Sequence, residues 1–529
     1  MSIFYSDPKN DGGGKSAKND ISLAEVCGIG GLVLVAVCWT QASRIEAFYI
    51  RNFQMIWMAG YLVVLALLFL ALRWFMRKNR ALLDDALTHE HLAKYHDSKT
   101  IHVGSCDGTP LGLSRKQRLG HVQIIGTTGR GKTESLILPW IVRDARNGVS
   151  SLVIDGKGDP ELASRVKRAL WGVAAVRVFD LGNPSKSASL NPLATGSAQA
   201  IVDRIFASFD FPDPFYKGVQ YDSALALVSA LKKAEPTKAV TFRRLHAVLV
   251  SDIELAKLAK ACPDARLKER LQRMLAQSRQ IREANHMGLV SQLAPFAEGE
   301  VSELVNGFTG DDVIEMEDSL CPSSSPEHRA PHVNIVLLPT LKYQIVAKQL
   351  GRMILQDLAG CVGERASRMG NQASFYSVFM DEFSAFAYEG FEQILNKARS
   401  SMVALHLSHQ STADLSMVSP DFARIVNTNT NVKCLLGLND PDTADFYARH
   451  IGTRASERRT ERVEDLGWMN ANARTGQASV RSVEEYKIHP NELKNFTHGC
   501  GVLHLPTPDG NFTARVQFAR LSPKESVSE

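Results

Sequence analysis

Residues 126 to 133 have the composition and spacing of a loop that holds phosphate groups. They read GTTGRGKT, which fits the pattern G-x-x-x-x-G-K-[ST]. Small residues let successive backbone N–H groups turn toward an anion, while the lysine reaches the β and γ phosphates and the threonine hydroxyl binds Mg²⁺. A glycine-rich turn that matches by chance is the alternative. We predict an ATP and Mg²⁺ site in this loop, which consists of Gly126, Thr127, Thr128, Gly129, Arg130, Gly131, Lys132 and Thr133.

The segment SFYSVFMDEFSAF supplies the acidic groups that ATP hydrolysis needs. Asp381 and Glu382 end an apolar run, the position from which an aspartate binds the Mg²⁺ and the next glutamate activates water. An acidic pair after a strand is often only a helix cap, and the phosphate loop favours the catalytic interpretation. A second apolar run ends at His409 and Gln410, whose amide is a candidate sensor of the γ phosphate.

Arg399 lies eleven residues before Gln410, at the other end of the same predicted strand. It is therefore too far to serve the nucleotide of its own chain. We interpret it as an arginine finger that acts on a neighbouring subunit. Arg454, Arg458 and Arg459 are alternatives for this role.

Elements that position these residues follow an alternating pattern of strands and helices. Apolar strand-like runs occur at 151–155, 176–180, 332–338, 374–380, 403–408 and 432–438. This alternation predicts a largely parallel sheet covered by helices on both faces. Between about 197 and 320 the sequence instead has helical periodicity without a comparable strand run. We expect an α/β nucleotide-binding domain with an all-helical insertion.

Two apolar segments near the N-terminus predict membrane attachment. They cover about 22–41 and 56–75, and a buried helical hairpin is the alternative. Basic residues are enriched before the first span and after the second, whereas the short connection between the spans has only Arg44 and Arg51. The positive-inside rule then places both termini in the cytoplasm.

Composition sets broad limits on the remaining functions. A chain of 529 residues with 44% hydrophobic residues has room for two or three packed domains, which excludes a disordered protein. A formal charge of +5 permits nucleic acid or anionic lipid as a partner without requiring either. Eight scattered cysteines without a C-x-x-C pair favour reduced thiols over disulfides or a zinc site.

The order of these motifs resembles that of the type IV secretion coupling proteins, the TraG/TraD-like ATPases of bacterial conjugation. The resemblance covers two N-terminal spans, GTTGRGKT, VIDGKGDPEL, a helical insertion, MDEF, SHQS and NTNVKCLLGLNDPDTADFYARHIG. It implies a RecA-like P-loop domain in a homo-hexamer of the bacterial inner membrane. It also implies ATP-driven delivery of DNA with a relaxase or other secreted protein to a type IV secretion channel. Matched residue by residue, it implies Lys132 and Thr133 for nucleotide and Mg²⁺, Asp381 and Glu382 for hydrolysis, Gln410 for the γ phosphate, and Arg399 as the trans finger.

The predicted organisation has five parts, and the substrate stays open. The parts are a membrane domain (1–80), a juxtamembrane connector (81–118), a first nucleotide-binding part (119–196), the all-α insertion (197–320) and a second nucleotide-binding part (321–529). A basic segment at 257–282 is either a nucleic-acid contact or a solvated helix face, and 451–462 is expected to form a flexible loop. A receptor that delivers protein effectors, with nucleotide controlling assembly, is the alternative function. An FtsK-like DNA translocase is a weaker alternative.

Overall fold

The computed structural model describes residues 57–58, 60–71, 94, 96–307, 312–320, 330–369, 373–466 and 471–526. The chain divides into two compact units, Met1–Asp84 and Asp85–Glu529. In the first unit the described residues 57–58 and 60–71 are helical. Among the described residues, no helix combines the length and the apolar run needed to cross a bilayer. The predicted span at 22–41 lies outside the described residues.

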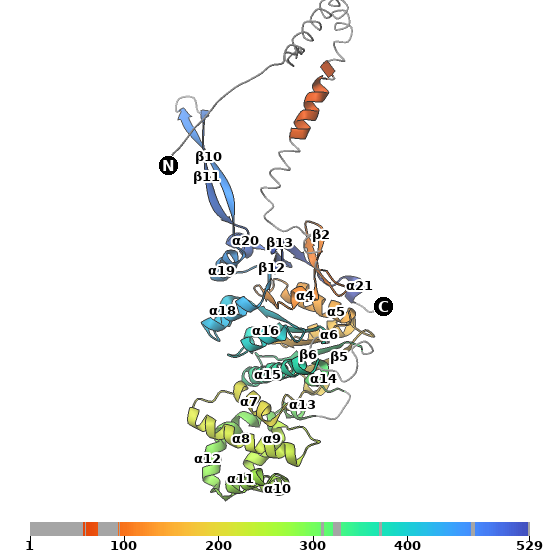
Figure 1. Ribbon diagram of the computed structural model, residues 1–529, viewed down its shortest axis with the longest axis vertical. Coiled ribbons are helices and arrows are strands. Elements are labelled where there is room, and N and C mark those ends of the chain that lie inside the picture. The colour runs from red at the N-terminus through yellow and green to blue at the C-terminus, as the bar shows by residue number, and fades with distance from the viewer. Residues whose placement is uncertain are drawn as a thin grey trace, which may run out of the picture. The chain divides into compact units, whose positions relative to one another are not determined.

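The second unit is built on an eleven-stranded sheet with the order β2-β1-β13-β12-β9-β3-β8-β7-β4-β6-β5. Figure 1 shows this unit with the helices that follow β5, in yellow and green, gathered at its lower end. The seven strands from β9 to β5 in this order are parallel to their neighbours. All six strand runs predicted from the sequence are among them. The parallel strands are β3 (Val122–Ile125), β4 (Ser151–Asp155), β5 (Ala175–Asp180), β6 (His332–Leu337), β7 (Tyr376–Asp381), β8 (Val403–His409) and β9 (Val432–Leu435).

Four antiparallel strands extend this sheet beyond β9. They are β1 (Ile101–Cys106), β2 (Thr109–Leu113), β12 (Cys500–Thr507) and β13 (Gly510–Phe518). The residues predicted as a connector between membrane and motor therefore include two strands of the sheet. They bring together segments about 400 residues apart in sequence, because β1 pairs with β13.

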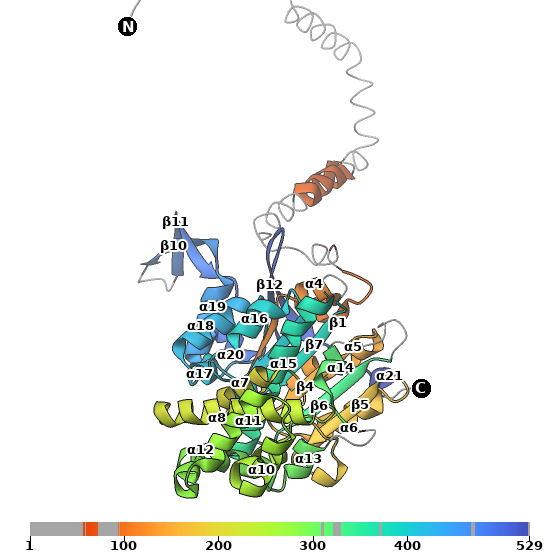
Figure 2. The same ribbon diagram turned by 60° about the horizontal axis from the view of Figure 1, so that its bottom comes forward.

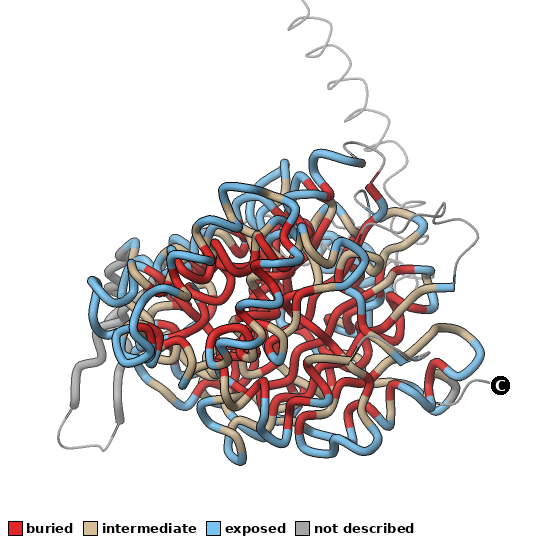
Figure 3. Tube along the Cα trace, turned by 90° about the horizontal axis from the view of Figure 1, so that it is seen from below, coloured by how far each residue is buried: buried red, intermediate tan, exposed pale blue. Residues whose placement is uncertain are grey.

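Helices cover both faces of the parallel strands, as predicted (Figure 2). One apolar core contains residues of α5 (Leu138–Arg146) and α6 (Pro160–Ala169) packed on alternate residues of β4, β6 and β7. A second core, on the other face, contains residues of α15 (Gln344–Met369), α16 (Glu392–Ala398) and α18 (Pro420–Asn429). Figure 3 shows the buried backbone running through the centre between these layers. The parallel strands other than the half-buried edge strand β5 are therefore buried on both faces, which explains their near-continuous apolar runs.

The described residues between β5 and β6 contain helices and no strand, as predicted. The helices are α7 (Ala198–Ser208), α8 (Pro214–Ala234), α9 (Phe242–Val250), α10 (Asp252–Ala261), α11 (Ala265–Ala276), α12 (Arg279–Ala297), α13 (Ser302–Asn306) and α14 (Met316–Leu320). The basic segment falls on α10 to α12. Several of its cations have acidic partners, such as Arg273 with Glu269 at 3.1 Å and Arg279 with Glu283 at 2.6 Å. This pairing favours a solvated helix face over a nucleic-acid contact.

One local prediction is wrong. Residues 451–462 do not form a flexible loop, because α19 (Pro441–Ile451) is followed by the long strand β10 (Thr453–Leu466). It pairs antiparallel with β11 (Ala471–Tyr486) as a separate two-stranded sheet. Polar and charged residues make up most of both strands, so the sequence lacks the alternation of apolar and polar residues that indicates a half-buried strand. The helix α20 (Pro490–Asn495) then leads to β12.

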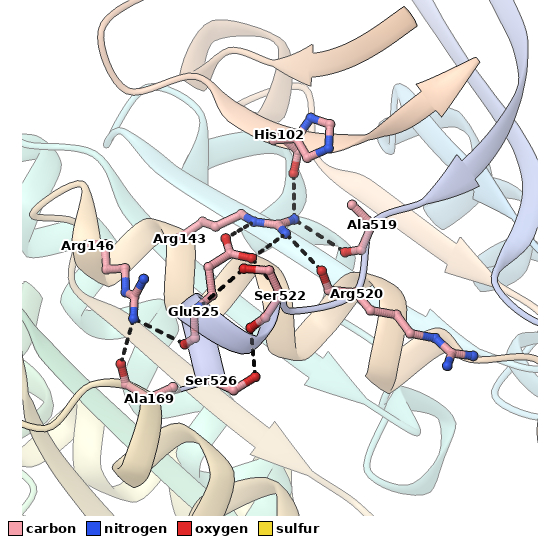
Figure 4. Close-up of polar contacts among 9 residues, drawn as sticks. All are labelled: His102, Arg143, Arg146, Ala169, Ala519, Arg520, Ser522, Glu525 and Ser526. Carbon is pink, nitrogen blue, oxygen red and sulfur yellow. Dashed lines mark hydrogen bonds and ion pairs between the residues drawn. The ribbon is translucent and has the colours of Figure 1, made fainter. Parts of the chain in front are cut away.

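The C-terminal helix α21 (Pro523–Ser526) is fastened to α5, the helix that follows the phosphate loop (Figure 4). Arg143 donates two hydrogen bonds to the Glu525 carboxylate, at 2.9 and 3.2 Å, and others to the carbonyls of His102, Ala519 and Arg520. Burial is the largest single effect and raises the pKa of Glu525, but hydrogen bonds from Arg143 and Ser522, together with the Arg143 charge, outweigh it and lower this pKa to about 2. Arg143 thus connects the last helix and the first strand to α5.

Candidate nucleotide-binding site

The predicted phosphate loop follows β3 at the carboxyl edge of the parallel strands. The Gly126 amide donates to the carbonyl of His409 at 3.3 Å, and the Thr127 amide donates to that of Gly437 at 3.0 Å. Gly129 and Gly131 have φ angles of +80° and +92°, which side chains adopt only under strain. A Cβ on Gly131 would also lie 2.7 Å from the ring of His498. The positive φ therefore favours glycine at 131, and any larger residue would also displace the exposed His498 ring.

The exposed part of the loop is short, and its neighbours fix both sides. Thr128 and Gly129 are exposed, whereas Arg130 donates to the carbonyl of Phe496 at 3.2 Å and its own carbonyl accepts from Gly499 at 3.0 Å. Contacts with the segments after β9 and before β12 thus hold the loop on the side away from β8. This arrangement leaves the tip open to a ligand.

Lys132 is buried beside this loop. Its ammonium donates to the carbonyl of Gly126 at 2.6 Å, and the residue is 4% exposed. Burial lowers the pKa of Lys132, although the nearby Glu382 and Asp381 carboxylates oppose this effect. The helix that follows begins as a π turn, Thr133–Ile137, before it continues as α5. Irregular turns of this kind are frequent at functional sites.

Thr133 and Asp381 lie together, as the metal prediction requires. The Thr133 hydroxyl donates to one oxygen of Asp381 at 2.7 Å, although 248 residues separate them in sequence. Ser408, at the end of β8, donates to the other oxygen at 2.7 Å. One hydroxyl and one carboxylate, with phosphate and water oxygens, are the ligands that Mg²⁺ prefers in such sites. The donor set therefore fits Mg²⁺.

Glu382 and Gln410 also converge. The Gln410 amide nitrogen lies 3.3 and 3.4 Å from the two carboxylate oxygens of Glu382. Glu382 has φ +49° and ψ +48°, a left-handed conformation that is uncommon outside glycine. Strained residues of this kind cluster at functional sites. The backbone turn directs the Glu382 side chain to the same edge of the sheet as the phosphate loop.

Lys157 is a member of this group that sequence reasoning missed. Its ammonium lies 2.9 Å from the Glu382 carboxylate. Burial opposes the charge of Lys157, but the neighbouring Asp381 and Glu382 carboxylates outweigh it and raise its pKa. The available signal was GKGDPEL directly after β4, because parallel strands bring their carboxyl ends to one edge.

Asp155, the last residue of β4, is a second missed member. It lies opposite Asp381 in the register of β4 and β7. Burial, with a contribution from the Asp381 charge, raises the pKa of Asp155 to about 6. The amides of Lys157 and Asp159 donate to its two oxygens at 2.9 and 2.7 Å, which orders the turn that presents Lys157.

Arg399 lies away from this constellation. It follows α16 and precedes β8, so it is at the amino end of the strand whose carboxyl end leads to Gln410. Its side chain is exposed and lines a small cavity of about 250 Å³ together with Lys116 and Gln117. The structure therefore does not bring Arg399 to the nucleotide site of its own chain. Of the alternatives, Arg454 is exposed on β10, and the side chains of Arg458 and Arg459 lie outside the described residues.

The fold is that of a RecA-like P-loop nucleotide-binding protein, with parallel strands around the loop-bearing β3 and a helical insertion. Solved structures share this fold at low sequence identity. A bacterial conjugative coupling protein, TrwB lacking its first 70 residues, matches with a TM-score of 0.57 and 14% identity over 83% of this chain and 93% of its own. TrwB in complex with the ATP analogue ADPNP matches with a TM-score of 0.58 and 14% identity, over 84% of this chain and 96% of that one.

VirB4 of Thermoanaerobacter pseudethanolicus shares the fold with a TM-score of 0.51 and 16% identity, over 81% of this chain and 99% of its own. The family described as the TraM recognition site of TraD and TraG matches residues 376–498. The Type 4 coupling protein DotL of Legionella pneumophila is 22% identical over 404 residues, which cover 65% of this chain and 51% of DotL. The chain thus spans about half the length of this curated relative. Together the matches confirm the resemblance to the type IV secretion coupling proteins.

Proposed function

We propose that this chain is an ATPase that couples ATP hydrolysis to recruitment of a DNA–protein substrate and its transfer into a type IV secretion channel. The convergence of Lys132, Thr133, Asp381, Glu382 and Gln410 at one edge of the sheet carries this proposal. The similarity to coupling proteins supports the cellular role.

Each residue has a defined part in the proposed mechanism. Lys132 and the loop amides bind the phosphates, while Thr133 and Asp381 would hold Mg²⁺, which would supply positive charge to the transferred phosphoryl group. Glu382 orients and deprotonates water, and Lys157 and Gln410 hold its carboxylate from two directions. Gln410 is then placed to respond when the γ phosphate leaves.

Turnover of ATP by the full-length chain tests this proposal. Lys132→Ala removes the buried ammonium and is expected to abolish hydrolysis. Lys186→Ala, at an exposed turn after β5, is the matched control and should keep parental turnover. Equal activity of the two variants would contradict the ATPase assignment.

The response to DNA distinguishes the proposed function from the effector receptor. A DNA-transferring ATPase should hydrolyse ATP faster when single-stranded or duplex DNA is added, because the substrate engages the motor. A receptor in which nucleotide controls assembly should respond to protein concentration and not to DNA. Turnover is therefore measured against both.

We also propose an inner-membrane location with both termini in the cytoplasm, supported by the apolar segments 22–41 and 56–75 and by their flanking charges. A reporter inserted near residue 48 should behave as periplasmic, and one inserted after Arg80 as cytoplasmic. The opposite pattern would invert the proposed topology.

Finally, we propose that Arg399 acts on the nucleotide of the next subunit in a homo-hexamer. The position of Arg399 at the opposite end of β8 from Gln410 supports this role. Arg399→Ala protein should be inactive alone and regain part of its turnover when mixed with Lys132→Ala protein, since some interfaces then pair an intact loop with an intact arginine. No gain on mixing would exclude a finger supplied in trans.

A further inference from the structure

A second cavity, of about 710 Å³, lies outside the nucleotide site. It is lined by residues of α17 (Thr412–Ser416), α18, α19, β12 and β13, with the loop before β9. Its lining residues carry hydroxyl, amide, imidazole and guanidinium groups, and none is Asp or Glu. Arg424, which lines it, is exposed and contacts Asp421 at 2.9 Å outside the cavity. We call this cavity the α18–α19 pocket.

One wall of the α18–α19 pocket is aromatic. The rings of Phe446 and His450, one turn apart on α19, are stacked with centroids 6.2 Å apart and an interplanar angle of 15°. His504 meets His450 edge to face at 5.6 Å. Burial lowers the pKa of both histidines, that of His504 to about 4, so these rings are neutral at pH 7. Phe446 is half-buried and His450 is exposed, so these two rings offer surface on which a base can stack, while the buried His504 supports His450 from behind.

The floor of the pocket rests on a buried cation. Lys433, on β9, is 1% exposed, and its ammonium donates to the side-chain oxygen of Gln123, the carbonyl of Asn427 and the hydroxyl of Thr430, each at 2.7 Å. All three partners are neutral. A buried charge without an opposite charge is costly, and burial lowers the pKa of Lys433 to about 7. Asn427 and Thr430 also line the pocket and form its floor, so the hydrogen bonds from Lys433 fix the position of this floor.

Hydrogen bonds continue from Lys433 to the candidate γ-phosphate sensor. The Gln123 amide nitrogen contacts Nε2 of His409 at 2.7 Å, and Nδ1 of His409 contacts the carbonyl of Ser411 at 2.8 Å. His409 directly precedes Gln410. The pocket and the catalytic edge of the sheet are therefore joined by Thr430, Lys433, Gln123 and His409.

We propose that the α18–α19 pocket binds a single nucleic-acid strand and that its occupancy acts through Lys433, Gln123 and His409 on Gln410. The absence of carboxylates from its lining admits a polyanion, and its neutral rings provide the stacking surface that single strands require. A phosphate near the floor would favour the charged form of Lys433 and so strengthen the hydrogen bonds that hold Gln123. The effect on Gln410 rests on the proposed function, whereas binding of the strand does not.

Fluorescence anisotropy of a labelled oligothymidylate with the detergent-solubilised full-length chain tests the binding step. Phe446→Leu should weaken binding about 5- to 150-fold, the range for loss of one base–aromatic stack. Phe215→Leu, the same change at a ring 71% exposed on α8, is the control and should keep parental affinity. Arg424→Gln is a surface change that should reduce the slope of log affinity against log salt by about one.

The coupling step is tested by Gln123→Met, at a buried position outside the pocket lining, which removes the amide that joins Lys433 to His409 and keeps a similar side-chain length. Oligothymidylate should still bind, while the ratio of stimulated to unstimulated ATP turnover should fall severalfold. Unchanged stimulation in this variant would overturn the coupling through Lys433.

Equal oligothymidylate affinity of Phe446→Leu and Phe215→Leu would overturn the binding site. So would loss of binding to a secreted or channel protein by Phe446→Leu with oligothymidylate binding intact, since the pocket would then be a protein site. If the parent chain binds the strand through Phe446 but does not hydrolyse ATP, the proposed function fails and the binding site stands. If the parent chain hydrolyses ATP but Phe446→Leu binds the strand as tightly as the parent, the binding site fails and the proposed function stands.

Discussion

Loss of Arg118 should destabilise the scaffold of the nucleotide site by several kcal/mol. Arg118, at the end of α4 (Arg115–Arg118), is fully buried and binds both oxygens of Asp144 on α5 at 2.6 Å. It also donates to His406 on β8 and Ser377 on β7. In Arg118→Met, the Asp144 carboxylate stays buried with the Ser377 hydroxyl, at 2.7 Å, as its remaining side-chain donor. A buried carboxylate that loses its partner costs about 3–5 kcal/mol.

Urea unfolding of the full-length chain, followed by far-UV circular dichroism, measures this loss. Arg118→Met combined with Asp144→Asn should recover much of it, because the second change removes the unpaired charge and keeps an acceptor for Ser377. Arg515→Met breaks an exposed pair with Glu492 and should cost less than about 1 kcal/mol. A loss below about 1 kcal/mol for Arg118→Met, or a double variant as unstable as the single one, would refute the reasoning.

Two further changes probe the catalytic edge and the C-terminal helix. Glu382→Gln should keep ATP binding and reduce hydrolysis by roughly 10² or more, measured by single-turnover kinetics, because shape is retained and the base is lost; normal hydrolysis would make Glu382 a structural residue. The Glu525 pKa is lowered to about 2 from its ordinary 4.5, so its ion pair with Arg143 should stabilise α21 fully above pH 4.5 and progressively less as the pH falls toward 2. The rate at which an acid-stable protease cuts the chain after residue 519 should rise as the pH falls over the same range in the parent. In Glu525→Gln this rate should no longer depend on pH in that range.

The parallel half of the fold could be predicted because its strands, apart from the half-buried edge strand β5, are buried on both faces. Such strands appear in the sequence as continuous apolar runs, and the runs from 151 to 438 all correspond to strands of the sheet. The antiparallel strands β1 and β2 carry weaker signals, since they are short and mix exposed with buried residues without a regular alternation. Their place in the sheet depends on pairing between segments about 400 residues apart in sequence, which no local pattern specifies.

The candidate site was predictable where a motif fixes a residue's role and missed where only geometry does. Lys132, Thr133 and Asp381 follow from spacing and from strand ends. Lys157 follows β4, and its ammonium reaches Glu382 because β4 and β7 are neighbours. Because β4 and β7 lie more than 200 residues apart in sequence, the strand order had to be known before Lys157 could be paired with the Glu382 carboxylate.

Lys433, Gln123 and His409 form a hydrogen-bonded polar row beneath the phosphate loop. Changing this row can show whether it serves stability or coupling between the pocket and the catalytic residues. In the register of three buried parallel strands, Gln123 lies between Lys433 on β9 and Leu407 on β8, only three residues before Gly126. Apolar side chains at such positions would normally be more favourable, since a buried lysine with neutral partners costs free energy. If the row served stability alone, an apolar residue at 433 would be neutral or stabilising and would leave activity unchanged. If the row serves coupling, an apolar residue at 433 should lower the ATPase activity of the protein even where its stability rises. In that case β3 transmits changes at β9 to both the phosphate loop and His409.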